Sequence, residues 1–137
     1  MREVETSRFV AAPPAAVARA LTPTAVVEAE GSFDVREVAP PEDDAEGEAA
    51  TTLVRAGRRG VSIVFAFEEL PDGLRYAQRE GPLEELTTTL SYRPENEGTR
   101  IDARSTVAVG PWPVERLAAW KRRGELNRAL RALAEEC

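Results

Sequence analysis

Hydrophobic and polar residues alternate along most of the chain, in short stretches separated by turn-forming residues. Such alternation is typical of strands that bury one face of a sheet. It predicts strands within residues 3–11, 33–39, 49–56, 61–70, 74–80, 83–93 and 99–109. The turns between successive later strands are short, as at Pro71-Asp72-Gly73, which predicts antiparallel neighbours. We therefore expect one curved, seven-stranded antiparallel sheet.

Two regions depart from this alternation and predict helices. Residues 15–21 are rich in alanine and follow Pro14, and residues 25–29 follow Pro23, so short helices are expected after the first strand. Residues 114–136 are rich in Ala, Leu, Arg and Glu and predict one long helix. The sequence thus indicates an α+β fold in which the sheet wraps around its last helix.

The long helical segment has an apolar face that changes side along its length. At about 100° per residue, one side of the first half carries Val114, Leu117 and Trp120. Leu126, Leu130 and Leu133 lie on roughly the opposite side, with Gly124 at the changeover. We expect the first half to close a pocket, and the helix to kink at Gly124 or its second half to bury another face, for example in a homodimer.

Length and charge limit the classes of function. A chain of 137 residues fits one domain, spanning residues 1–137. The net charge of −6 disfavours a nucleic-acid partner, which needs a basic surface. The apolar runs are too short to span a bilayer and the first residues do not resemble a signal peptide, so we expect a cytoplasmic protein without a membrane span. The acidic surface also suits a high-salt cytoplasm, which is a hypothesis.

The residue composition disfavours several kinds of catalytic and metal-binding site. The chain contains no histidine, which takes away the commonest general base and the commonest ligand of catalytic zinc. Its one cysteine, Cys137, rules out an intrachain disulfide, and the acidic residues 40–48 fit a solvated hairpin tip better than a calcium loop. We expect no metal and no cofactor. Lys121 is the only lysine among 18 basic residues, and the pairs Arg58-Arg59 and Arg122-Arg123 suggest solvated surface.

The segment Phe9-Val10-Ala11-Ala12-Pro13-Pro14-Ala15-Ala16-Val17-Ala18-Arg19-Ala20-Leu21-Thr22-Pro23 resembles the opening of the START-like (SRPBCC) superfamily. This group includes polyketide cyclase or dehydrase-like, lipid-transfer-like and birch-pollen-allergen-like proteins. Ala18 stands where tryptophan is common in the group. The resemblance implies a helix-grip fold with a cavity between the sheet and the last helix. It also implies binding or transport of apolar small molecules and, in some members, cyclisation or dehydration of a polyketide.

The predicted inward faces define a candidate pocket with apolar walls and a few polar groups, the usual make-up of a small-molecule site. The apolar candidates are Ile63, Phe65, Phe67, Leu86, Leu90, Leu117 and Trp120. The polar candidates are Arg8, Tyr76, Gln78, Glu80, Thr88, Tyr92 and Ser105. The same pattern also fits a core filled by its own side chains, with the polar groups at the strand ends in water.

Three functions remain open at this point. The first is a binder or carrier of a hydrophobic small molecule. The second is a cyclase- or dehydratase-like enzyme, for which Glu80 with Tyr76 is the candidate acid–base set. If Arg8 lies beside Glu80 instead, it would oppose this use and would anchor an acidic group of the ligand. Glu84 and Glu85 form a weaker pair because neighbouring strand residues point to opposite faces. The third is an interaction module with a filled core whose last helix mediates self-association.

Overall fold

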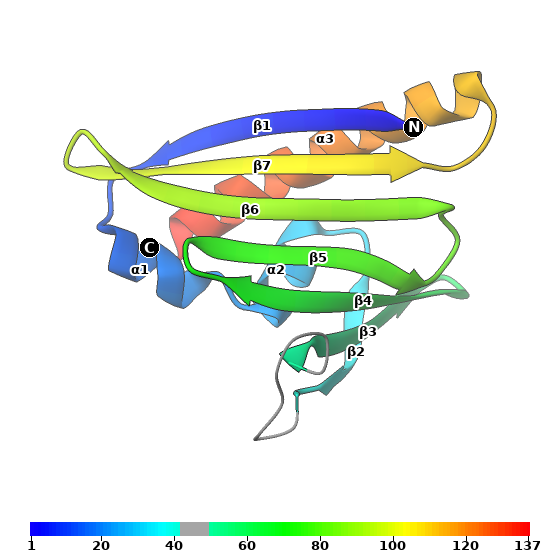
Figure 1. Cartoon of the computed structure of the whole chain (residues 1–137), viewed down its shortest axis with the longest axis horizontal. Coiled ribbons are helices and arrows are strands. Elements are labelled where there is room, and N and C mark those ends of the chain that lie inside the picture. The colour runs from blue at the N-terminus through cyan, green and yellow to red at the C-terminus, as the bar shows by residue number, and fades with distance from the viewer. Residues whose placement is uncertain (42–49) are drawn as a thin grey trace.

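The computed structural model describes residues 1–41 and 50–137, and these form one antiparallel sheet with helices packed on one of its faces (Figure 1). The strands are β1 (Arg2–Val10), β2 (Asp34–Ala39), β3 (Thr52–Arg58), β4 (Val61–Leu70), β5 (Gly73–Glu80), β6 (Glu85–Glu95) and β7 (Gly98–Ala108). The helices are α1 (Pro14–Ala20), α2 (Pro23–Glu30) and α3 (Trp112–Glu135). The predicted seven-stranded sheet with a long last helix is confirmed within the described residues. The predicted acidic hairpin tip falls mostly on residues 42–49, outside them.

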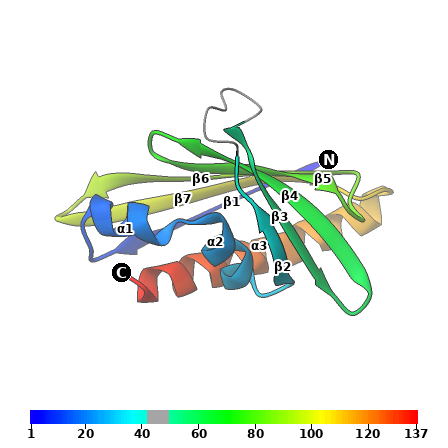
Figure 2. The same cartoon turned by 90° about the horizontal axis from the view of Figure 1, so that it is seen from below.

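The sheet has the strand order β1-β7-β6-β5-β4-β3-β2. Each strand from β2 to β7 pairs with its neighbour in sequence, whereas β1 pairs with β7, from Arg2 opposite Val107 to Val10 opposite Thr99. The two short helices carry the chain from β1 at one edge to β2 at the other. Figure 2 shows all three helices beneath the sheet, with the β2–β3 end curving toward α3.

Local sequence features set the ends of the short helices. Pro14 and Pro23 occupy first-turn positions, where the missing N–H of proline is tolerated. The Thr22 side chain caps α2 by accepting a hydrogen bond from the backbone N–H of Ala25 at 3.2 Å. Gly31 ends α2 in the left-handed conformation with φ of 79°, which glycine adopts without strain. These stops place Glu30, the last residue of α2, beneath the sheet.

Helix α3 runs through Gly124 without a break, and of the two expected alternatives the structure shows the second, in which the second half of the helix buries another face than the apolar side of the first half. Leu126, Leu130 and Leu133 are fully buried against the sheet, and the buried stripe continues toward the N-terminus through Arg122. The apolar residues of the first half point away from this stripe. Val114, Leu117 and Trp120 are 49%, 65% and 76% exposed. The apolar pattern misled because the inward face of the first half of α3 carries the small Ala118 and the charged Arg122 instead of large apolar residues.

The main core lies between the sheet and the second half of α3. Phe65 and Phe67 of β4 and Tyr76 of β5 form an aromatic cluster, in which the Phe67 and Tyr76 rings stack with centroids 4.5 Å apart. Side chains fill the space between α3 and the sheet less tightly beside the first half of the helix.

None of the helices in the described part of the chain has the length and apolar character that a membrane crossing requires.

Candidate functional site

A cavity of about 270 Å³ lies between the first half of α3, the residues that follow α2, and strands β4, β6 and β7. Its apolar walls are formed by Phe33, Ile63, Phe65, Pro82, Leu83, Leu86, Val107 and Ala118. Its polar lining is formed by Glu30, Lys121, Arg122 and Glu125. Pro82 and Lys121 are solvent-exposed, so this side of the cavity faces solvent.

The short loop between β5 and β6 closes one end of the cavity. The Gln78 side chain holds this loop by donating to the backbone oxygen of Leu83 at 2.7 Å and accepting from its N–H at 3.1 Å. A Cβ atom at Gly81 would lie 2.5 Å from the Gln78 side chain and 2.9 Å from that of Ile63, so glycine is needed for this close approach. These two hydrogen bonds fix the backbone of Leu83, whose side chain forms part of the cavity wall. The opposite wall leaves room because Ala118 is small.

A buried polar cluster borders the cavity, and we call it the Arg122 cluster. It consists of Glu30, Tyr76, Thr88, Ser105, Arg122 and Glu125. The two terminal nitrogens of Arg122 bind the Glu30 carboxylate, each at 3.1 Å. Arg122 also donates to the Tyr76 hydroxyl and to Thr88 Oγ1 at 2.7 Å, and to Ser105 Oγ at 3.1 Å. One arginine thus joins α2, α3 and three adjacent strands.

Strand register explains how the hydroxyl groups of the cluster meet. Tyr76 of β5 lies opposite Thr88 of β6, which lies opposite Ser105 of β7. The three side chains form a row across the inner face, and Thr88 Oγ1 and Ser105 Oγ are 2.8 Å apart. The Tyr76 hydroxyl donates to the Glu30 carboxylate. Every buried side-chain nitrogen and oxygen among the described residues has a hydrogen-bond partner.

The electrostatics of the cluster favour fixed protonation states near neutral pH. Burial raises the pKa of the Tyr76 phenol well above its ordinary value, so it remains a neutral donor. Burial alone would lower the pKa of Arg122, but the Glu30 and Glu125 carboxylates outweigh it and the pKa is raised. Burial acts to raise the pKa of Glu125, yet Arg122, Ser32 and Lys121 together hold it below its usual range. Arg122 and Glu125 therefore both remain charged.

The outer end of the cluster reaches solvent at Lys121. Its Nζ lies 3.2 Å from Glu125 Oε2 and 3.4 Å from Ser32 Oγ. The Ser32 hydroxyl donates to the same Glu125 oxygen. The Lys121 side chain is 64% exposed, against 10% for Glu125, so Lys121 forms the rim of the cavity.

The structure brings together part of the predicted site. Phe65 and Leu86 line the cavity with Ile63, as the inward faces suggested, and Tyr76, Thr88 and Ser105 meet in the Arg122 cluster. Gln78 supports the loop described above instead of lining the cavity. Phe67 and Leu90 are fully buried in the core beyond it.

Other predicted site residues lie away from the cavity. Arg8 and Tyr92 are both level with Ile101 in the sheet, six positions along β7 from Val107, a distance of about 20 Å. Arg8 is exposed and Tyr92 is half-buried. Leu117 and Trp120 point to solvent on the far side of α3, so neither forms a wall.

Glu80 is displaced by an irregularity in β5. Gln78 pairs with Phe65 but Glu80 pairs with the preceding residue, Val64, so Arg79 is an extra residue that forms a β-bulge. The bulge turns Glu80 to the outer face, where it is exposed. The predicted pair of Glu80 with Tyr76 or Arg8 is therefore not formed.

Sequence reasoning missed the charged members of the cluster. The pair Arg122-Arg123 suggests solvated surface by sequence, but only Arg123 is exposed. The signal that was available is the leucine stripe of α3. Counting back four residues from Leu126 reaches Arg122, and four more reach Ala118, which lines the cavity. The inward position of Glu30 had no comparable signal.

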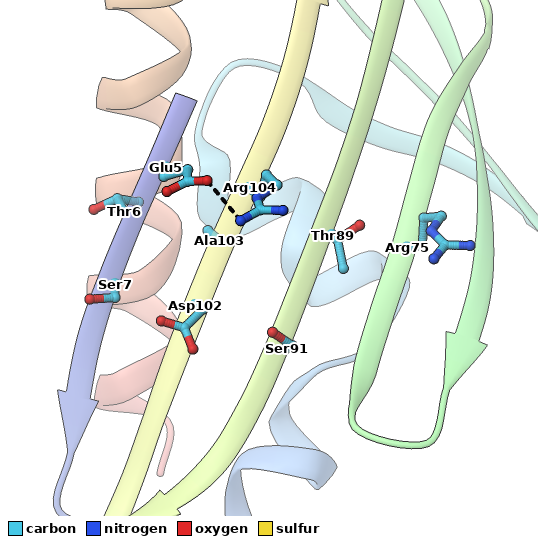
Figure 3. Close-up of a pocket in the computed structure, with 9 residues that line it drawn as sticks. All are labelled: Glu5, Thr6, Ser7, Arg75, Thr89, Ser91, Asp102, Ala103 and Arg104. Atoms are coloured by element: carbon cyan, nitrogen blue, oxygen red, sulfur yellow. Dashed lines mark ion pairs between the residues drawn. The ribbon is translucent and has the colours of Figure 1, made fainter. Parts of the chain in front are cut away.

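A second, larger depression of about 720 Å³ lies on the outer face of the sheet, across β1, β7, β6 and β5 (Figure 3). Its lining is polar, with hydroxyl groups such as Thr89 and Ser91 between charged residues. The charged side chains pair with others on the same face, as Arg104 does with Glu5 at 2.8 Å and Arg75 with Glu68 at 2.8 Å. This arrangement is that of a solvated outer sheet face, and it lacks the apolar walls of a small-molecule site.

Solved structures with the same fold cover nearly the whole chain. A protein from Thermus thermophilus has 21% sequence identity and a TM-score of 0.72, with 98% of this chain and 96% of that chain covered. A START superfamily protein from Mycobacterium smegmatis has 14% identity and a TM-score of 0.69, with 97% of each chain covered. The di-domain ARO/CYC StfQ from the steffimycin biosynthetic pathway has 19% identity and a TM-score of 0.63, with 98% of this chain and 51% of that chain covered.

At these sequence identities the solved structures establish the shared fold. The search of curated proteins found no significant match to the sequence. The family model described as polyketide cyclase / dehydrase and lipid transport matches residues 1–137. The match extends over every strand and helix that builds the cavity and the Arg122 cluster. The chain belongs to the polyketide cyclase / dehydrase and lipid transport family.

Proposed function

We propose that this protein binds a small, largely apolar molecule in the cavity between the sheet and the first half of α3. The observation that carries the proposal is an apolar-walled cavity left open beside a fully hydrogen-bonded polar cluster. Its volume of about 270 Å³ lies just below the roughly 300–1,000 Å³ of typical ligand pockets. A ligand with one or two rings suits this space.

The contacts of the ligand follow from the walls. Phe65, Leu86 and Ile63 form the sheet side of the cavity, and Ala118 lies on its helix side. Burying an apolar ring against these side chains releases about 25 cal/mol for each square ångström removed from water. The Arg122 cluster fixes the position of α3 over the sheet, because it ties the helix to three strands and to α2. Its role in the proposal is to keep the cavity open in a defined shape.

The proposal is tested by filling the cavity from the helix side. Ala118→Phe places a ring in the cavity, whereas Leu117→Phe places the same ring on the exposed neighbouring position. We expect calorimetric titration with neutral 2-naphthylmethanol to show binding to the wild type and to the Leu117→Phe protein, and none to the Ala118→Phe protein. Circular dichroism checks that both variants fold. Equal binding by both variants, or no binding to the wild type, would refute the proposal.

A cyclase-like activity is the second candidate function, and the family description and the name of the StfQ neighbour support it. The specific observation is the Glu125 carboxylate in the cavity lining. Glu125 is ionised at neutral pH and can accept a proton, but its lowered pKa makes it a weaker base, so this activity would depend on the position of the substrate beside it. This differs from the Glu80 and Tyr76 set expected from sequence.

Deuterium exchange at the methyl group of 2-acetonaphthone, followed by NMR, tests this activity. The exchange reports removal of a proton next to a carbonyl, the step that starts an aldol-type cyclisation. We expect the wild type to accelerate it and Glu125→Gln to abolish the acceleration while 2-naphthylmethanol still binds. Exchange at the buffer rate in the wild type, with normal 2-naphthylmethanol binding, would leave binding as the function.

A further inference from the structure

The only lysine of the chain lies in the lining of the cavity. The sequence has 18 basic residues, of which Lys121 alone is lysine, and its side chain forms the rim between Ser32 and Glu125. Lysine and arginine differ at such a position. Lysine carries a compact point charge on a flexible stem, whereas arginine carries a broad, planar group. A lysine therefore supplies a positive charge while leaving more of a small cavity free.

Lys121 has hydrogen-bonding capacity that the other cation of the cavity lacks. The donors of Arg122 are directed at Glu30, Glu125, Ser105 and two further hydroxyl groups of its cluster. An ammonium group has three N–H donors, and Lys121 has two acceptors, Glu125 and Ser32, among the described residues. One donor of Lys121 remains for another partner. Among the charged side chains that line the cavity, it is the cation able to take a new acceptor without breaking a buried contact.

The acidic side of the cavity is already occupied. Glu125 Oε1 accepts from Arg122 at 3.4 Å, and Oε2 accepts from Ser32 and Lys121. Glu30 accepts from Arg122 and Tyr76. A cationic ligand would compete with these donors for the carboxylates, whereas an anionic oxygen would use the free donor of Lys121.

We propose that Lys121 is a specificity-determining residue that selects ligands with an apolar body and an anionic oxygen, in particular a carboxylate, at the end facing the rim. This inference rests on the proposed binding function and adds the chemical class of the ligand. The apolar body lies against Phe65 and Leu86, and the carboxylate accepts a charge-assisted hydrogen bond from Nζ of Lys121. Such bonds are roughly twice as strong as those between neutral groups.

Three probes with the same naphthalene body test the selection: 2-naphthoate, 2-naphthylmethanol and 2-naphthylmethylamine, which are anionic, neutral and cationic at neutral pH. Calorimetric titration of the full chain should rank them in that order of affinity. In Lys121→Met, 2-naphthoate should bind about tenfold more weakly, as expected for loss of one charged hydrogen bond. Affinity for 2-naphthylmethanol should stay within about twofold. Lys121→Arg keeps the charge and should retain most of the preference for 2-naphthoate.

A second readout uses the fact that the chain has one lysine. Selective ¹³C-labelling of lysine gives NMR signals from Lys121 alone and keeps its three N–H donors intact. We expect 2-naphthoate to shift the Cε signal of Lys121, and 2-naphthylmethanol not to shift it by a comparable amount.

The outcomes separate this inference from the proposed function. Binding of 2-naphthylmethanol together with an equal affinity for 2-naphthoate in wild type and Lys121→Met would overturn the role of Lys121 and leave the cavity function standing. Tighter binding of the amine than of the carboxylate would also overturn it. If none of the three probes binds the wild type, the proposed function and the inference both fail.

Discussion

Replacing Arg122 with methionine removes the cation that joins α2, α3 and three strands. Methionine has a similar length and fills apolar space without strain. The change leaves the Glu30 carboxylate, whose side chain is 5% exposed, without its charged partner. Glu125 is less affected, because Lys121 lies 3.2 Å away and Ser32 also donates to it. The energetic consequence therefore falls mainly on Glu30.

Removing one partner of a buried ion pair destabilises proteins by about 3–5 kcal/mol. The side chains of Arg122 and Glu30 are both 5% exposed, so solvent provides little compensation and this range applies here. Since single domains are stable by about 5–15 kcal/mol, we expect Arg122→Met to remain folded with much reduced stability. Glu30→Gln in the same background removes the stranded charge, so the double variant should lose less stability than the sum of the two single variants, by about 2 kcal/mol.

Urea unfolding followed by circular dichroism measures these differences, with the slope of each transition compared to confirm that the same surface is exposed. Arg123→Met is the matched control because Arg123 is the exposed neighbour on the same helix, and its change should stay within about 0.5 kcal/mol. A loss of less than about 1 kcal/mol for Arg122→Met would refute the reasoning. Strict additivity of the two single changes would refute the coupling between Arg122 and Glu30.

Three further predictions concern single groups. Gly124→Ala should stabilise the protein to urea by about 0.5–1 kcal/mol, because Gly124 lies within α3 and a Cβ there would meet only Arg128 at an ordinary 3.7 Å; a loss of stability would indicate that the helix needs glycine there. The pKa of Glu125 is lower in the folded protein than its ordinary value, so its stabilisation is present above about pH 4.3 and is lost as the pH falls through the folded-state pKa. Urea titrations from pH 5 to pH 3 should therefore show a steeper loss for the wild type than for Glu125→Gln, and parallel losses would contradict this. Burial raises the pKa of Tyr76, so the stabilisation that Tyr76 contributes is complete below about pH 10 and declines at higher pH, where the tyrosine of the unfolded chain ionises. In a Tyr92→Phe background, phenolate absorbance should appear only as the protein unfolds. Phenolate absorbance in the folded protein would contradict the burial of Tyr76.

The fold was predictable because each strand buries one face against the same core. In β4, for example, Ile63, Phe65 and Phe67 are buried, while Val64 and Ala66 between them are only half-buried. Period-two alternation reports this contrast directly. The two short helices were also predictable, because Pro14 and Pro23 mark positions that helices tolerate only in their first turn.

The site was less predictable because it depends on register and on buried charge. The inward direction of Tyr76, Thr88 and Ser105 follows from alternation, but their meeting in one row depends on pairing between strands. The direction of Glu80 depends on the bulge at Arg79, which alternation does not reveal. In α3, hydropathy placed the charged Arg122 outside, because a charge is buried only when partners distant in sequence compensate for it.

The pairing of β1 with β7 has a consequence for the order in which the protein folds. Strands β2 to β7 form a chain of successive hairpins, so each can pair soon after its neighbour is made. Strand β1 cannot pair with β7 until residues 98–108, which form β7, have been synthesised. Contacts between such distant segments slow folding, and an unpaired strand edge is prone to aggregation. During synthesis, β1 is therefore the strand that waits longest for its partner, and its edge stays unpaired until β7 has been made.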